Sequence, residues 1–270
     1  MTFIVAVFST VACSTKPSDD PVAVVKRYYS YLVAGDYGRV YDLESAASRG
    51  TITKEQYVAW RELQALNVTY ALGELTLERE LTEHTIGETK YLHAAEVHVV
   101  LNSNHLPTGL TPSQDLLVVA VAENRKWKLA FAPRDINRLM SNEHYWLGIT
   151  YILGKGRAVD FAEALQTFQK GISADETNAL NHLGLGHAYR ALGQYSEAVE
   201  AYTTCVSVCD AAAGEFDYEK AQALFSIGAI YETKLADRDG AIEYYLASLE
   251  ALPDNEYALE ALQRLGIILN

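Results

Sequence analysis

An acidic and a basic side chain stand two residues apart in an alternating segment of the chain. Glu96 and His98 lie within Tyr91 to Leu101, a run that predicts a β-strand, so both side chains project from the same face. A histidine beside a carboxylate titrates near neutral pH and can carry acid–base chemistry. The alternative is a solvated or simple cross-strand contact. We keep Glu96 and His98 as a candidate pocket pair, name no catalytic residue and expect no enzyme.

Two cysteines could also carry chemistry. Cys205 and Cys209 stand four residues apart on a predicted helix and share a face, without a His or Cys companion at metal-ligand spacing. An i, i+4 pair in a regular helix suits the narrow geometry of a disulfide poorly. The chain also lacks the motifs of a nucleophile elbow or a phosphate loop. We therefore expect two small buried side chains, no metal site and no cofactor.

The first residues, MTFIVAVFSTVA, form an apolar stretch of about the length of the hydrophobic region of a secretory signal and end in small residues before Cys13. Val11-Ala12-Cys13, followed by Ser14, resembles a bacterial lipobox, although Thr10 stands where Leu is usual and no basic residue precedes the apolar stretch. The resemblance implies a signal peptide over residues 1–12, a lipid on Cys13, a tether over residues 13–20 and an outer-membrane lipoprotein facing the periplasm. An ordinary cleaved signal or a short buried strand is the alternative.

Helix signals follow the polar tether. Asp20-Pro21 is a favourable helix start, and apolar residues recur at helical spacing until Gly35 closes the segment. Asp36 opens a second helix, and Thr53 with Gln56 resembles a capping box that begins a third. Three helices are therefore expected before residue 67.

After Asn67 the apolar period changes to two, with a phase slip at Gly73 that predicts a β-bulge. Four strands are expected, in a curved antiparallel sheet. The order of helices and strands, together with the run PVAVVKRYYSYLVAGDYGRVYDL, resembles nuclear-transport-factor-two-like domains from Asp20 to Pro133. The resemblance implies an α+β cone-like domain over residues 21–140, a fold that hosts enzymes as well as binding modules.

The second half of the chain repeats itself. The spacing of an apolar-small pair, an aromatic, a small residue, an aromatic and a small residue matches the tetratricopeptide pattern at Leu185-Gly186, Tyr189, Ala198, Tyr202 and Cys205. Small residues let the two helices of a hairpin cross closely while the aromatic rings fill the space beside them. The resemblance implies an all-α solenoid over residues 141–270.

Two further copies differ in their turns. The later copy runs from Leu224 to Pro253 with one extra residue between Leu235 and Gly240. The earlier copy starts at Leu147-Gly148, and its longer turn, with Gly154, Gly156 and Asp160, resembles the Sel-one-like variant of the repeat. A final amphipathic helix over residues 257–269 is expected to cap the stack.

The net charge is concentrated in this second half. Residues 141–270 contain 8 basic and 19 acidic residues, while residues 21–140 contain 13 and 14. We find no basic stripe that would attract a phosphate backbone, so nucleic acid is excluded as a partner. The carboxylates either favour a basic or neutral partner or keep the exposed helix faces soluble.

These patterns favour an adaptor over an enzyme. The leading hypothesis is an exported, lipid-anchored scaffold of the cell envelope that binds a protein or peptide through its repeats and contacts the membrane through the lipid alone. The alternative is a small-molecule-binding or catalytic cone domain with the repeats as a docking arm, and a third possibility is a subunit of a fixed assembly. The exposed partner-facing candidates, placed on the first helix of each hairpin as the family implies, are His144, Asn178, Asn181, His182, Gln222 and Ser226.

Overall fold

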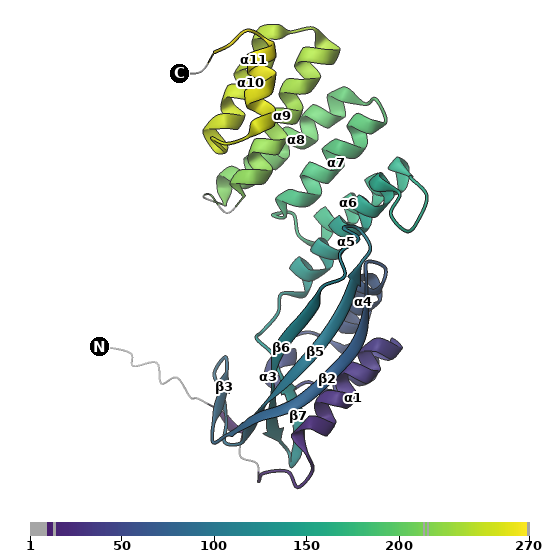
Figure 1. Cartoon of the computed structure of the whole chain (residues 1–270), viewed down its shortest axis with the longest axis vertical. Helices are drawn as coiled ribbons and strands as arrows, with labels where there is room; N and C mark the ends of the chain where they lie inside the picture. The colour runs from purple at the N-terminus through teal and green to yellow at the C-terminus, as the bar shows by residue number, and fades with distance from the viewer. Residues whose placement is uncertain (1–9, 13–14, 213, 215, 269–270) are drawn as a thin grey trace, which may run out of the picture. The chain divides into compact units, whose positions relative to one another are not determined.

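The chain folds as two compact units, and each is described by itself. The computed structural model describes residues 10–12, 15–212, 214 and 216–268. The units are Met1–Leu139 and Met140–Asn270. The first unit combines helices with antiparallel sheet, and the described part of the second is helical throughout (Figure 1). Across the described ranges, every helix is too short or too polar to cross a bilayer.

The described part of the first unit contains four helices, one more than the sequence predicts. The additional helix, α3, has four residues and is capped by Ser45, whose hydroxyl accepts a hydrogen bond from the Ser48 backbone N–H at 3.2 Å. A helix this short shows no periodicity, so pattern reasoning misses it. The capping box of Thr53 and Gln56 is confirmed, with hydrogen bonds of 2.9 and 3.2 Å. The four helices are α1 (Pro21–Ala34), α2 (Tyr37–Leu43), α3 (Ala46–Arg49) and α4 (Lys54–Ala65).

Four strands form the main antiparallel sheet in the order β2-β5-β6-β7, as the alternation predicts. The bulge at Gly73 is confirmed, because the pairing of β2 with β5 shifts between Leu72 and Leu75. A Cβ atom on Gly73 would approach the Val100 carbonyl oxygen to 3.0 Å, so a side chain there would be tightly crowded. The strands are β2 (Val68–Leu81), β5 (Ala94–His105), β6 (Ser113–Glu123) and β7 (Lys126–Ala130).

A second, smaller sheet corrects the expected start of one strand. The sequence predicts a strand from Tyr91, but Tyr91 ends β4 (Thr89–Tyr91) and pairs with β3 (His84–Ile86). Residues 92 and 93 separate the small sheet from β5, so the strand expected to start at Tyr91 starts at Ala94. β1 (Thr10–Ala12) pairs in parallel with β4. Cys13 lies outside the described residues, so its lipidation stays a prediction.

Helix α1 covers one face of the main sheet and contacts all four of its strands. Val24 and Val25 of α1 are fully buried, as are Val97 and Val99 of β5. Because side chains alternate along a strand, Glu96 and His98 lie on the sheet face opposite α1. The core of this unit is therefore on the other side of β5 from the candidate pair.

The second unit contains three helical hairpins and a last helix in its described part (Figure 1). A glycine on each first helix faces an aromatic ring on its second helix. A Cβ atom on Gly148 would lie 2.5 Å from the Phe168 ring, and one on Gly186 would lie 2.4 Å from the Tyr202 ring. The expected close crossing is thus confirmed. The helices are α5 (Ile136–Leu153), α6 (Phe161–Ala174), α7 (Ala179–Ala191), α8 (Tyr195–Ala211), α9 (Asp217–Ile230), α10 (Arg238–Ala251) and α11 (Glu256–Arg264).

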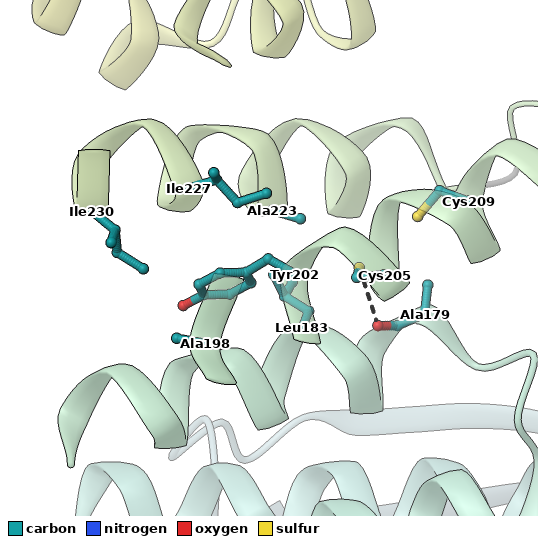
Figure 2. Packing of buried hydrophobic residues seen from close by; sticks show 9 residues of the cluster. All are labelled: Ala179, Leu183, Ala198, Tyr202, Cys205, Cys209, Ala223, Ile227 and Ile230. Carbon is teal, nitrogen blue, oxygen red and sulfur yellow. Dashed lines mark hydrogen bonds between the residues drawn. The ribbon is translucent and has the colours of Figure 1, made fainter. Parts of the chain in front are cut away.

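The central hairpin shows how the aromatic ring is enclosed. Figure 2 shows Tyr202 among side chains of α7, α8 and α9, including Leu183, Ala198 and Ile227. Tyr202 is fully buried. Consecutive hairpins therefore share one apolar core, and each stabilises its neighbour.

Two details of the repeats differ from the expected ones. The extra residue of the third hairpin is absorbed by a π-helical turn, η1 (Tyr231–Leu235), at the end of α9 rather than by the loop after Leu235, because i→i+5 bonding accommodates an inserted residue within the helix. The last helix ends at Arg264, earlier than expected, since Gly266 adopts a left-handed backbone with φ of 77°. The glycine turn of the first hairpin is as expected, with positive φ at Gly154 and Gly156.

Candidate functional site

The candidate pair of the first unit contacts different partners. Glu96 accepts hydrogen bonds from Arg79 of β2 at 2.5 and 3.1 Å, and these bonds lower the pKa of its carboxyl group. The His98 Nε2 atom lies 3.8 Å from a carboxylate oxygen of Asp115 on β6. Each side chain is thus engaged across the sheet, which matches the cross-strand alternative and gives no convergent acid–base site.

Sequence reasoning missed a buried polar cluster in this unit. Glu44 is fully buried and accepts hydrogen bonds from the hydroxyl groups of Tyr28 and Tyr57 at 3.1 and 2.8 Å. Its second oxygen accepts one from Arg134. Arg61 donates to both tyrosine hydroxyls at 3.1 Å. Partners from α1, α4 and the segment after β7 converge on one carboxylate, which ties these elements together.

Burial keeps the tyrosines of this cluster neutral, because it raises the pKa of Tyr28 well above its ordinary value and raises that of Tyr57. Neutral hydroxyl groups can donate to Glu44 and accept from Arg61 at once. We read the cluster as a structural lock, because the buried Glu44 carboxylate accepts hydrogen bonds from Arg134 and from two tyrosine hydroxyl groups on separate elements.

Four of the six partner-facing candidates in the second unit are buried, which corrects the expectation of exposure. The exposed fractions are 6% for Asn178, 0% for Asn181, 8% for His182 and 3% for Ser226. These positions lie on sides of the first helices that pack against neighbouring helices. His144 and Gln222 are half-buried. Helical spacing places residues on a first helix, but it does not reveal which sides the neighbours cover.

Asn181 instead completes a repeated backbone contact. In the second and third hairpins, a backbone carbonyl in the first turns of the first helix accepts a hydrogen bond from a side chain of the second helix. The distance is 3.4 Å from Cys205 to Ala179 and 2.8 Å from Ser248 to Ala221. The first hairpin has Gly171 at the equivalent position, and Asn181 donates to the Ser141 carbonyl at 3.0 Å in its place. A Cβ atom on Gly171 would lie 2.2 Å from the Asn181 side chain. The buried asparagine is therefore scaffold.

The first helices carry a regular row of apolar side chains. Each member stands three residues before the position at which its helix packs against a neighbouring helix. In α5, α7 and α9 that position is Gly148, Gly186 and Gly228, respectively. Helix α7 contacts α9 directly, Asn181 of α7 bonds to Ser141 of α5, and the rings of Phe225 on α9 and Tyr257 on α11 lie 5.9 Å apart, so first helices of neighbouring hairpins are adjacent. We call this set the apolar row. Its members are Tyr145 of α5, Leu183 of α7, Phe225 of α9 and Leu259 of α11.

Three of the four members of the apolar row are partly accessible, and Leu183 is buried in the core that the hairpins share. Tyr145 and Phe225 are half-buried, Leu183 is 6% exposed and Leu259 is 38% exposed. Burial raises the pKa of Tyr145 to about 12, with smaller contributions from the charge of Glu219 and from Tyr218 on α9. The charged groups at the start of α9, in the third hairpin, are therefore close enough to Tyr145 of the first hairpin to affect its pKa. Gln222 stands one turn before Phe225 and extends this face.

His187 lies one turn after Leu183 on the same helix. Its Nδ1 atom is 2.7 Å from the Tyr202 hydroxyl oxygen, which joins α7 to α8. Burial lowers the pKa of His187 to about 4, and the charge of Arg190 adds to the effect. The imidazole is therefore neutral at physiological pH.

Lowering the pH from 7 to 5 is expected to destabilise the second unit by about 2 kcal/mol through His187. Its pKa is depressed from the ordinary 6.5 to about 4 in the folded protein. Between these values the unfolded chain binds a proton that the folded chain does not, so stability falls as the pH falls. Urea titrations at both pH values measure the loss, and His187→Asn should remove it. An unchanged pH dependence in the variant contradicts the assignment.

The remaining candidates for chemistry are the two cysteines and any metal-binding cluster. Cys205 and Cys209 are free and buried, as expected. Within the part of the chain that the structure describes, no three His, Cys, Asp or Glu side chains gather closely enough to hold a metal ion.

The repeat helices match a known family. The tetratricopeptide repeat family matches residues 175–254, which span α7 to α10. The first tetratricopeptide domain of Spaghetti (RPAP3), solved with the HSP90 peptide SRMEEVD, is 22% identical at a TM-score of 0.40, over 48% of this chain and 92% of that one. The N-terminal domain of stress-induced protein-1 from C. elegans is 19% identical at a TM-score of 0.42, over 49% and 99%. MamA is 27% identical at a TM-score of 0.34, over 41% and 57%. Residues 175–254 of this chain are tetratricopeptide repeats.

Proposed function

We propose that this protein is an adaptor whose repeat unit binds a protein or peptide on the face of its first helices. The observation that carries the proposal is the tetratricopeptide match at residues 175–254, together with the apolar row that the same helices leave partly accessible. Tetratricopeptide stacks present extended binding surfaces and derive their stability from neighbouring repeats.

The proposal extends to location and to the first unit. The lipobox-like Val11-Ala12-Cys13 supports export and lipid anchoring at Cys13, in the outer membrane and facing the periplasm. The helices and antiparallel sheet of the first unit support a nuclear-transport-factor-two-like domain that acts as a second binding or positioning module. The long glycine turn of the first hairpin supports a Sel-one-like repeat there.

Replacing Cys13 with serine tests the anchor. Because the lipid is attached through the thiol, Cys13→Ser is expected to abolish incorporation of labelled palmitate and to move the protein from the membrane fraction to the soluble fraction. Radiolabelling and fractionation of expressing bacteria measure both effects. Cys205→Ser, in the buried core, serves as the control that retains the label. Equal labelling of the Cys13 variant contradicts the lipoprotein assignment.

Two matched leucine variants test the binding face. Leu259 belongs to the apolar row and is 38% exposed, whereas Leu246 lies on the second helix α10 and is 36% exposed. Proteins crosslinked to the full chain in intact cells are captured and identified for the wild type, Leu259→Ser and Leu246→Ser. We expect one reproducible partner whose yield falls at least tenfold in Leu259→Ser and is unchanged in Leu246→Ser. Equal yields from both variants contradict a role for this face.

A further inference from the structure

Two cations on the first helices of the repeat unit form ion pairs, whereas Arg190 of α7 is exposed. Lys220 of α9 forms an ion pair with Asp210 at 2.5 Å, and Arg264 of α11 forms one with Glu232 at 2.7 Å. The Lys234 ammonium lies 5.3 Å from the centre of the Tyr195 ring. These contacts partly offset the charges of Lys220, Arg264 and Lys234.

Carboxylates flank the apolar row. The charge of Glu219 on α9 contributes to the raised pKa of Tyr145, and Glu256 and Glu260 are exposed on α11 on either side of Leu259. Residues 141–270 carry a net charge of −11. A segment with acidic residues beside its apolar anchors would meet like charge at this face, whereas lysine or arginine would meet opposite charge.

The spacing of the row also limits its occupant. Packed helices lie roughly 8–10 Å apart, and an extended chain covers that distance in about three residues. Tyr145, Leu183, Phe225 and Leu259 each come from a different first helix. An extended segment that crosses these helices therefore needs an apolar side chain at about every third position.

We propose that the apolar row binds an extended peptide segment with apolar residues about three positions apart and lysine or arginine between them, and that it rejects acidic segments. The inference rests on the proposed function and adds the chemistry of the partner. Apolar contact supplies the anchors, and Glu219, Glu256 and Glu260 select the sign of the intervening charge.

Selection from a displayed random-peptide library on the purified full chain tests both the proposed peptide binding and its charge preference. We expect enrichment of segments with this spacing and with basic intervening residues. Enrichment of acidic segments overturns the inference but leaves peptide binding intact. Recovery of no enriched sequence above an empty support contradicts the proposed function itself, so the two failures are distinguishable.

Synthetic peptides then test the charge preference directly. Fluorescence anisotropy measures the affinity of three peptides. The first has leucine at every third position and lysine between, the second has glutamate in place of lysine, and the third is the acidic peptide SRMEEVD. The lysine peptide is expected to bind at least tenfold more tightly than either acidic peptide at low salt. Leu259→Ser should weaken it about tenfold and Leu246→Ser should not. Equal or tighter binding of the glutamate peptide overturns the inference.

Discussion

Replacing Glu44 with alanine is expected to destabilise the first unit by about 3–5 kcal/mol. Glu44 is fully buried and is the shared acceptor of Tyr28, Tyr57 and Arg134. Without the carboxylate, the mostly buried guanidinium group of Arg134 loses its negative partner, and the two buried tyrosine hydroxyl groups lose an acceptor. Breaking one side of a buried ion pair is strongly destabilising because the remaining charge stays desolvated.

Urea unfolding followed by tryptophan fluorescence measures the loss, since Trp60 and Trp127 both belong to this unit. Glu44→Gln keeps an acceptor atom while removing the charge, so a smaller loss is expected. Glu62→Ala replaces an exposed glutamate of α4 and should remain within about 0.5 kcal/mol of the wild type. A loss below about 1 kcal/mol in Glu44→Ala contradicts the structural lock.

Replacing Gly186 with leucine is expected to destabilise the repeat unit by about 3 kcal/mol and to abolish binding at the apolar row. A Cβ atom at this position would lie 2.4 Å from the Tyr202 ring, and Tyr202 is enclosed on all sides by the shared core. Leucine has a better helix propensity than glycine by about 0.8 kcal/mol, which offsets only part of the clash. Because the hairpins stabilise one another, the disturbance reaches α9.

Circular dichroism at 222 nm during heating measures the effect of Gly186→Leu. Ala191→Leu adds a similar side chain at an exposed position of the same helix, so its melting temperature should be close to that of the wild type. An unaltered melt for Gly186→Leu contradicts the placement of the helix crossing.

Local patterns predicted much of the fold. The capping box of Thr53 and Gln56 and the bulge at Gly73 depend on neighbours within a few residues, and both are confirmed. The glycine–aromatic spacing of Gly186 and Tyr202 is likewise a property of one hairpin, and a family match supports it. Each of these features is encoded in a short stretch of sequence.

Features that depend on distant partners were not predictable in this way. Glu44 meets Arg134 across 90 positions of sequence, so no spacing rule marks it. Asn181 was expected to be exposed, but it fills the space left by Gly171 and reaches back to Ser141. The apolar row escaped notice because its aromatic and leucine members follow the same period as core residues. Only the packing of consecutive hairpins shows which of them remain accessible.

Site-specific photocrosslinking tests the central claim most directly. A photoreactive phenylalanine derivative replaces Gln222, one turn from Phe225 on the first helix α9, or Gln169, which is exposed on the second helix α6. After irradiation of intact cells, the full chain carrying the probe at position 222 is expected to form a discrete covalent product with its partner, and the chain carrying it at position 169 is not. A product from position 169 together with none from position 222 would contradict the assignment of the first-helix face as the binding surface.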